Sequence, residues 1–410
     1  MPGRSPRVLP ALAATTGVAA GAALLLRPRS GVLAPLPVRA SSYFTQAELA
    51  RARDFTRPQL ALLAARSVVE AAVLAGLVRR ASRARRPRAR HPGALAAARA
   101  GVATSVVLQT ATLPITLAAR RRAIGVGLTT DPWRSWAVDR AKATAIGGVI
   151  AGGGAATAAA LMRHTGDAWW LPASAVAIAV AAGSLYLAPL VIDPMFNTFT
   201  VLPAGRTRDA VLELAGRADL RVGEVFTVDA SRRTTAANAY VTGMGPTKRV
   251  VLYDTLLEHF SADETRLVIA HELAHVRHRD VLRGLAFAAI VAPVGLLAVA
   301  HITARLAPGS RGQPAAAVVP ALALAASVVA LPVGVVARHL SRRVEARADT
   351  FALEATGAPE AWISFERRIA VRNLADPDPP AWRRTLLATH PATPQRIGIT
   401  KAYASRMARP

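Results

Sequence analysis

The chain has 410 residues, a formal net charge of +26 and no cysteine. Without cysteine, disulfides, cysteine-ligated metals and a cysteine nucleophile are all excluded. Hydrophobic residues make up 52% of the chain and its mean hydropathy is +0.30, values typical of an integral membrane protein and high for a soluble domain.

Seven apolar stretches each approach the roughly 20 residues that cross a bilayer as a helix. In chain order they are residues 8–26, 59–78, 95–119, 143–162, 168–191, 284–304 and 314–337. We read the first as an uncleaved span and not as a signal peptide, because an arginine-rich segment and further spans follow it. The sequence therefore predicts a mainly α, polytopic membrane protein with about seven transmembrane helices.

Two patterns inside the predicted spans suggest packing. Arg66 and Glu70 lie four residues apart in the second span, and such an intramembrane pair indicates a polar cavity or a helix–helix contact. Gly148 and Gly152 form a G-x-x-x-G pattern, which is typical of closely packed helices and implies no chemistry.

The positive charge is concentrated between the apolar stretches. Loops 27–58, 79–92 and 120–142 are all rich in arginine. Such clusters usually set membrane topology and contact anionic lipid, so we expect a lipid bilayer and no nucleic acid as partner. Because three successive loops are basic, counting positive charges does not choose an orientation.

The polar region between the fifth and sixth spans contains three short segments with the composition of strands, at 224–231, 238–242 and 249–253. A small β-sheet is useful to a protease, because an exposed edge strand can hold a peptide in an extended form.

The pentapeptide that begins at His271 matches H-E-x-x-H, the zinc-hydrolase signature. On a helix, His271 and His275 lie one turn apart on the same face, so both rings can reach one metal ion. Glu272 is offset by one residue, where a general base for a water molecule would lie. The alternative is a helix with two packed histidines and no metal.

The motif helix has a predicted start. Ser261 and Glu264 form a capping box, and the apolar residues that follow indicate a buried helix. His278, three residues after His275, is a possible further ligand, but we favour a polar residue at the helix end beside two arginines.

A zinc site needs a third protein ligand and leaves a fourth position for water. Glu345 and Asp349 lie four apart beside an apolar stripe, so Glu345 is a candidate ligand and Asp349 a candidate partner for the outer nitrogen of a histidine. Spacing alone leaves open a solvated surface pattern of glutamate and arginine. Two spans separate Glu345 from the motif, and an even number returns the chain to the same membrane face.

Several segments in a shared order resemble one family, the zinc-dependent CAAX prenyl proteases, which are integral-membrane metallopeptidases with seven spans. The resemblance covers most of the chain. It is carried by the motif helix, by Tyr43-Phe44-Thr45, Asp193-Pro194-Met195-Phe196-Asn197-Thr198-Phe199, Asn238-Ala239-Tyr240-Val241-Thr242-Gly243 and Val251-Leu252-Tyr253-Asp254-Thr255-Leu256, by the Glu345/Asp349 segment, and by His390-Pro391 with Arg396-Ile397.

The resemblance implies one Zn²⁺ per chain, with Glu345 as its third ligand and Asp349 hydrogen-bonded to a ligating histidine. It also implies that Asn238, Ala239 and Tyr240 line the substrate, with Asn238 on its backbone. His390 and Arg396 match positions that support the oxyanion.

The resemblance further implies a multi-pass protein of the cell membrane with its catalytic regions in the cytosol. The expected organisation is an amino-terminal membrane domain (1–191), a first peptidase part (192–283), two spans (284–337) and a second peptidase part (338–410). The expected substrate is a peptide ending in a CAAX box or another membrane-associated peptide or protein. The oligomeric state is not predicted.

The predicted function is that of a membrane zinc endopeptidase in a zincin-like fold, with Glu272 as the base. One alternative is a catalytically inactive membrane scaffold or chaperone, which would be expected to lack Glu272 or a ligand. Another is a stress-type quality-control metalloprotease, against which the extra amino-terminal spans argue. A transporter would explain the spans. It would not explain the H-E-x-x-H motif, and the sequence lacks the repeated halves typical of transporters.

Overall fold

A computed structural model describes residues 8–83, 93–218, 220, 224–243, 249–308 and 315–409. Seven of its helices are long and apolar enough to cross a membrane, and each overlaps one of the seven predicted stretches, which confirms that prediction. They are α1 (Val8–Leu26), α2 (Gln46–Arg83), α3 (Ala94–Ala111), α5 (Trp133–Thr165), α6 (Trp170–Leu187), α11 (Asp280–Leu306) and α12 (Ala315–Thr356). Residues 84–92 of the predicted loop 79–92, and residue 314 of the last stretch, lie outside the described residues.

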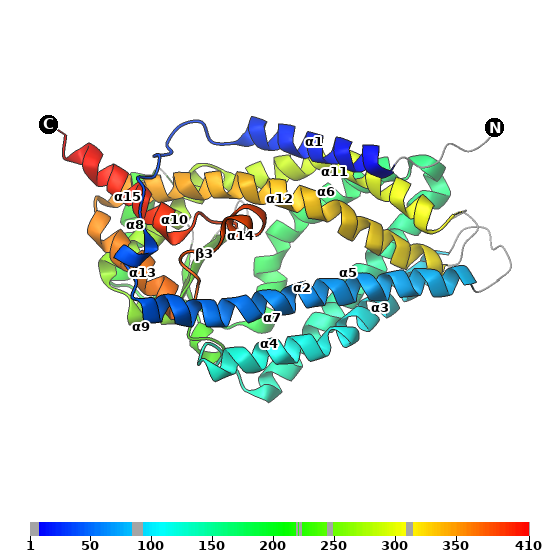
Figure 1. Cartoon of the computed structure of the whole chain (residues 1–410), viewed down its shortest axis with the longest axis horizontal. Coiled ribbons are helices and arrows are strands. Elements are labelled where there is room, and N and C mark those ends of the chain that lie inside the picture. Colours follow the sequence, from blue (N-terminus) through cyan, green and yellow to red (C-terminus); the bar gives the residue numbers. More distant parts are fainter. Residues whose placement is uncertain are drawn as a thin grey trace.

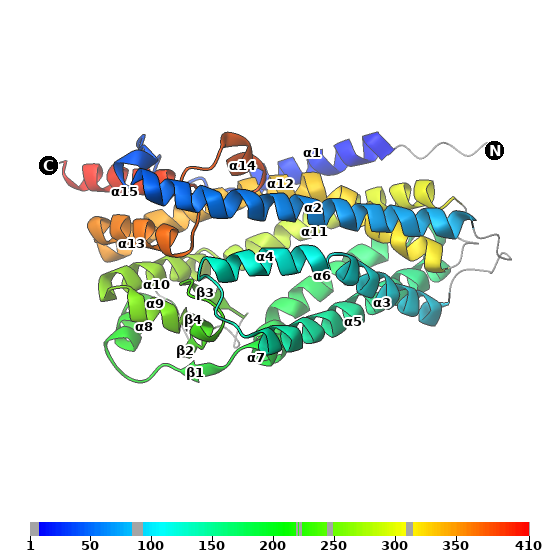
Figure 2. The same cartoon turned by 60° about the horizontal axis from the view of Figure 1, so that its bottom comes forward.

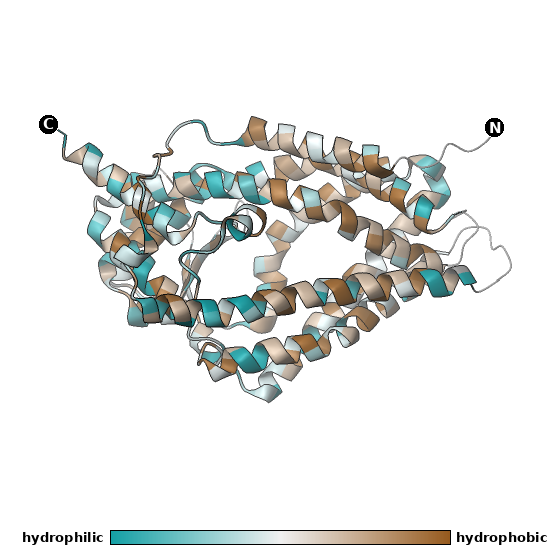
Figure 3. Cartoon of the chain, viewed as in Figure 1, coloured by the Kyte–Doolittle hydropathy of each residue, from teal (hydrophilic) through white to brown (hydrophobic). Residues whose placement is uncertain are grey.

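The long helices run side by side along the longest axis of the molecule, and the strands and short helices gather at one end (Figures 1 and 2). Hydrophobic residues dominate the long helices, whereas hydrophilic residues are frequent at the end that carries the strands (Figure 3). We call this end the polar end, and the strands and short helices that form it the polar module. The arrangement gives one membrane-spanning bundle with a polar module on one side.

The third predicted span, 95–119, is wrong in one respect, because the structure divides it into two helices. Helix α3 ends at Ala111, Thr112 has φ −91° and ψ −2°, and α4 (Leu113–Gly125) begins after it. Pro114 lies in the first turn of α4, where its missing N–H is tolerated. Pro114 was therefore the sequence signal for this break.

Helices α3 and α5 pack closely through glycine. A Cβ atom on Gly101 would lie 2.4 Å from the carbonyl oxygen of Ala151, and one on Gly152 would lie 3.0 Å from Val102. The packing role predicted for the G-x-x-x-G pattern is confirmed, with Gly101 on the partner helix as a third glycine.

The polar end contains a four-stranded sheet in the order β1-β2-β4-β3. Strands β2 (Val225–Val228), β3 (Ala239–Thr242) and β4 (Arg249–Tyr253) fall within the three predicted segments, whereas β1 (Phe199–Val201) was not predicted. Strands β2 and β4 are parallel, and the two outer pairs are antiparallel. Among the described residues β3 pairs with β4 alone, so it is an edge strand of the sheet.

Helix α10 packs against β3 and α9 against β4. The short helices of the chain are α7 (Asp193–Phe196), α8 (Arg206–Arg217), α9 (Asp254–His259), α10 (Ala262–Arg277), α13 (Pro359–Arg372), α14 (Ala381–Leu386) and α15 (Thr393–Met407). The core of the polar end includes Leu252, Leu267, Ile269, Leu273 and Trp362, each at most 1% exposed. Helix α12 is 42 residues long, about 63 Å, so it leaves the bundle and enters this core as one continuous helix.

Candidate metal centre

The helix that carries the H-E-x-x-H motif begins where the sequence predicts. The Ser261 side chain accepts a hydrogen bond from the Glu264 backbone N–H at 3.2 Å, and the Glu264 carboxylate accepts one from the Ser261 N–H at 2.8 Å. The capping box is confirmed. Arg368 of α13 also donates to Glu264 at 2.5 Å, so the first turn of α10 is attached to the neighbouring helix.

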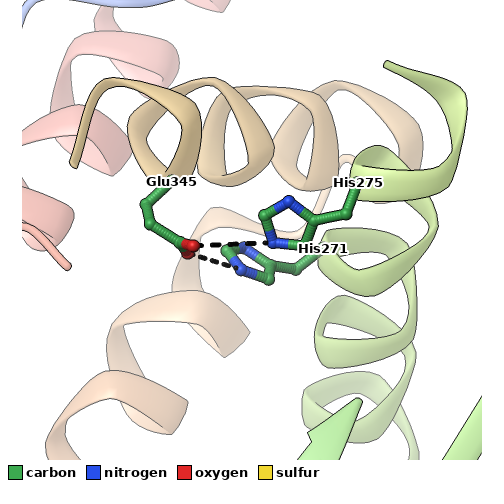
Figure 4. A group of neighbouring side chains, drawn as sticks. All are labelled: His271, His275 and Glu345. Carbon is green, nitrogen blue, oxygen red and sulfur yellow. Dashed lines mark hydrogen bonds and ion pairs between the residues drawn. The ribbon is translucent and has the colours of Figure 1, made fainter. Parts of the chain in front are cut away.

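Three side chains from two helices converge in the polar core. His271 and His275 project from α10 and Glu345 projects from α12 toward them (Figure 4). The Nε2 atoms of the two histidines lie 3.2 Å and 3.8 Å from the oxygens of Glu345. One ligand atom from each of the three residues lies within 4.8 Å of the others.

This donor set fits a zinc ion. Two imidazoles and one carboxylate are the protein ligands of a known class of catalytic zinc sites, which keep the fourth position open. Each of the three side chains offers one ligand atom, and these atoms lie within 4.8 Å of one another. The residues therefore suit the metal that the motif predicts.

Each histidine has a carboxylate behind its other ring nitrogen. The Nδ1 atom of His271 lies 3.0 Å from Asp349, and that of His275 lies 3.1 Å from Asp280. Such partners fix the tautomer of a ligating histidine and direct its Nε2 toward the metal. The sequence predicted Asp349 for this position, but it did not predict Asp280.

Behind Asp349 lies a buried network of charged groups. Arg396 contacts Asp349 through Nε at 2.9 Å and through a terminal nitrogen at 2.6 Å. Its other terminal nitrogen lies 2.6 Å from Glu366, a residue that is 2% exposed. The guanidinium is thus directed at two carboxylates, and the oxyanion role expected for Arg396 stays a prediction.

The charged groups shift one another's pKa values. Burial lowers the pKa of His271, but Asp349 and Glu345 outweigh it and raise that pKa to about 10. Burial also raises the pKa of Glu272, while the nearby charges of His271 and His275 oppose that rise. The two carboxylates therefore favour the protonated form of His271, and metal binding would displace that proton. Glu272 has the raised proton affinity that suits a group accepting and returning a proton.

Strand β3 lies against α10 and faces the motif. The backbone of Val241 lowers the pKa of Glu272 by hydrogen bonding, which relates the motif glutamate to this edge strand. Asn238 is exposed just before β3, Ala239 is buried, and the Tyr240 ring packs edge-on against Tyr253 at 6.3 Å. Burial, with Asp193 and Tyr253 adding to it, raises the pKa of Tyr240 to about 12.

Asn373, the residue directly after α13, holds the segment that leads into β3. The Ala237 N–H donates to Asn373 Oδ1 at 3.1 Å, and Asn373 Nδ2 donates to the Ala237 carbonyl at 3.2 Å. This paired contact fixes the residue directly before Asn238. Asn373 was not predicted, because it lies 136 positions away in the chain.

Two further histidines lie at different distances from the group. The Nε2 atom of His390 is 3.2 Å from Glu345, and its Nδ1 atom is 3.0 Å from the Thr389 hydroxyl. The His390 side chain is 56% exposed, so it lies at the open side of the site. His278 is at the end of α10, where its Nδ1 atom is 2.9 Å from the Ala274 carbonyl, in line with the helix-end position that we favoured.

Comparison with known proteins agrees with this geometry. Residues 202–403 match the model of peptidase family M48, and residues 125–198 match the CAAX prenyl protease N-terminal model, described as five membrane helices. The chain is 31% identical to an uncharacterized metalloprotease, YhfN of Bacillus subtilis, over 58% of this chain and 57% of the relative. It is 30% identical to a Protease HtpX homolog of Ralstonia nicotianae, over 46% of this chain and 70% of the relative.

A solved structure shares the whole fold. The crystal structure of S. mikatae Ste24p matches with a TM-score of 0.74 at 18% identity, covering 96% of this chain and 97% of the other. By sequence, the chain spans little more than half the length of its Bacillus relative. The two family models together account for the polar module and for the spans that lead into it, and the predicted resemblance is confirmed. The chain belongs to peptidase family M48 and carries the amino-terminal membrane region of the CAAX prenyl proteases.

Proposed function

We propose that this protein is a membrane-embedded zinc metalloendopeptidase. The single observation that carries the proposal is the convergence of His271, His275 and Glu345 within 4.8 Å. Glu272 lies on the same helix and an edge strand lies beside it, so ligands, base and peptide-binding edge occupy one site. Membership of a peptidase family adds independent support.

His271, His275 and Glu345 would hold one Zn²⁺. When bound, the ion supplies a Lewis acid that polarises the scissile carbonyl and lowers the pKa of a water molecule to about 7. Asp349 and Asp280 orient the two imidazoles from behind, so that both Nε2 atoms face the same point as the Glu345 carboxylate.

Glu272 would act as general base and then as general acid. Its carboxylate accepts a proton from the water that attacks the carbonyl carbon, and returns that proton to the amine nitrogen when the C–N bond breaks. The raised pKa of Glu272 suits both halves of this exchange. His390, beside Glu345 on the open side, would stabilise the negative charge that develops on the carbonyl oxygen.

The exposed edge of β3 would bind the substrate in an extended form by main-chain pairing. Asn238, directly before β3, and Ala239 and Tyr240 at its start would line this edge, and the exposed Asn238 would contact the peptide backbone, as the family resemblance implies. Asn373 supports the strand from behind. Arg396 donates to both carboxylate oxygens of Asp349, so we infer that it holds Asp349 in place and does not contact the substrate directly.

The proposed substrates are membrane-associated peptides, with a CAAX-type carboxyl terminus as the first candidate. The N-terminal family match supports that candidate. We place the polar module, formed by 192–283 and 338–410, in the cytosol and residues 1–191 and 284–337 in the membrane. The rival reading, an inactive membrane scaffold, is disfavoured because every motif residue is in position.

The first test is Glu272→Gln in the purified full-length protein. Because glutamine cannot accept the proton, we expect at least a hundredfold loss of peptide cleavage with zinc content unchanged. Cleavage is measured on a fluorescent membrane peptide, and zinc by elemental analysis. Undiminished cleavage would exclude Glu272 as the base, and it would leave the ligand assignment untouched.

The second test is Glu345→Ala, with Glu354→Ala as matched control on the same helix. Glu354 is 49% exposed and contacts only Arg406 among the described residues, at 3.8 Å. Glu345→Ala removes one of three ligands, so we expect zinc content and affinity to fall, whereas the control should keep both. Wild-type zinc content in Glu345→Ala contradicts the ligand assignment.

A further inference from the structure

A pocket of about 410 Å³ lies where two spans leave the apolar part of the bundle. Helices α5 and α6 follow one another as a hairpin, so the start of α5 and the end of α6 are at the same level. Lys142 directly precedes the apolar stretch 143–162, and Met195 lies four residues after 168–191. Lys142 Nζ donates to the Met195 carbonyl at 2.7 Å, which places the pocket at the boundary of the membrane. We call it the boundary pocket.

The boundary pocket carries more cations than carboxylates. Its described lining has four basic residues, Arg134, Lys142, Arg232 and Arg233, and one acidic residue, Asp139. Arg233 pairs with Asp139 at 2.5 Å, Lys142 lies 4.0 Å from that carboxylate, and Arg232 pairs with Asp229 at 3.1 Å. Arg134 is exposed and has no ion-pair or hydrogen-bond partner in the part of the chain that the structure describes. Positive charge therefore exceeds what the protein itself neutralises.

The same pocket continues into an apolar, exposed surface. Val138 and Met195 line it and are 54% and 40% exposed. Leu190 and Val191, five and four residues before Met195 in the chain, are 51% and 53% exposed. Arg134, Val138 and Lys142 lie at intervals of four residues and share one face of α5. A ligand at this position meets cations at one end and apolar side chains at the other. Trp133, 46% exposed on the same helix end, is typical of the interfacial belt of a membrane protein.

We propose that the boundary pocket binds the headgroup of an anionic phospholipid. The phosphate would lie among Arg134, Lys142 and Arg232, and an acyl chain would extend along Val138 and Val191. Arginine and lysine are the usual partners of phosphate oxygens, and basic pockets between transmembrane helices bind anionic headgroups. A free phosphate ion shares the headgroup chemistry but would gain nothing from the apolar side.

The test uses the purified full-length protein in detergent and three soluble probes: dioctanoyl phosphatidylglycerol, dioctanoyl phosphatidylcholine and inorganic phosphate. Binding is followed by native mass spectrometry over a titration series. We expect phosphatidylglycerol to bind at least tenfold more tightly than either other probe. Equal affinity for phosphatidylcholine would overturn the requirement for anionic charge, and equal affinity for inorganic phosphate would overturn the lipid assignment.

Two variants locate the site. Arg134→Gln should weaken phosphatidylglycerol binding about fivefold, and Arg134→Gln with Lys142→Gln about thirtyfold, from about 1 kcal/mol per cation near the surface. The single variant protects the test against misfolding, because Arg134 has no partner to lose in the described structure. Arg121→Gln is the control, since Arg121 is exposed two residues beyond the stretch 95–119 and does not line the pocket. Equal weakening by Arg121→Gln would show a general effect of charge and overturn the proposal.

Discussion

Each ligating histidine has a carboxylate behind its ring, Asp349 for His271 and Asp280 for His275, but the charged groups around these two carboxylates differ. We call the two groups the His271 side and the His275 side. Behind His271, Asp349 and Glu366 share the single guanidinium of Arg396. Behind His275, the single carboxylate of Asp280 is shared by two guanidiniums, those of Arg283 and Arg347. The first side has two acidic side chains for one guanidinium, and the second has two guanidiniums for one carboxylate.

The two sides also differ in burial. Side-chain exposure is 0% for Asp349 and 2% for Glu366, compared with 9% for Asp280 and 20% for Arg283. A charge that is fully removed from water depends on its partners, whereas a partly hydrated one tolerates the loss of a partner. The His271 side should therefore be sensitive to single substitutions, and the His275 side should be more tolerant.

The largest expected effect is that of Arg396→Gln. This change removes the guanidinium that pairs with the fully buried Asp349 and contacts Glu366, so we expect the free energy of unfolding to fall by about 3–5 kcal/mol. The matched change on the other side is Arg347→Gln, which leaves Arg283 in contact with Asp280 and should cost clearly less. Thermal unfolding of both variants in detergent measures the difference. Equal losses would remove the proposed contrast between the two sides.

The next effect concerns pH. Burial raises the pKa of Glu366 to about 7, against the lowering effect of Arg396, whereas the unfolded value is near 4.5. The native protein therefore keeps a proton that the unfolded chain releases, so stability falls as pH rises from about 4.5 to 7 and is level above that range. At about 1.4 kcal/mol per pKa unit, the loss is on the order of 3 kcal/mol.

Glu366→Gln should remove this slope. The measurement is the melting temperature of wild type and variant between pH 4.5 and 8, with Glu354→Gln as an exposed control. We expect the wild-type melting temperature to fall relative to Glu366→Gln across the window, and the control to follow wild type. Parallel profiles for wild type and Glu366→Gln would contradict a protonated Glu366 in the native state.

What the sequence predicts well is local. The capping box at Ser261 and the pair His271/His275 depend only on helix geometry, which fixes residues one turn apart on one face. The seven spans follow from length and hydropathy in the same way. Glu345, 70 positions after His275, needed the family resemblance, because spacing alone left a surface pattern equally open.

The missed residues depend on tertiary structure. Asp280 follows the motif helix closely, but Arg279 between α10 and α11 has a left-handed φ of 54°, so the chain changes direction and helical spacing no longer applies. Glu366 reaches Arg396 only because α13 and α15 pack together. The sequence signal for Glu366 was weak: Trp362 and Ala370 lie one helical turn away on either side, but Arg367 follows directly, and nothing in this pattern names Arg396 as a partner.

The smallest effect is expected for Asp280→Asn. The asparagine keeps the size of the side chain but removes the negative charge that orients the His275 ring and raises its basicity as a ligand. Zinc affinity should therefore fall about 10- to 100-fold, with little change in melting temperature. Zinc affinity is measured by competition with a chelator. Asp376→Asn is the control, because Asp376 is also a poorly exposed carboxylate paired with an arginine, Arg383 at 3.2 Å, but lies outside the metal group. If Asp280→Asn keeps wild-type affinity while Arg396→Gln destabilises the fold, the His275 side contributes packing alone, and orientation of the ligands rests on the buried Asp349 network.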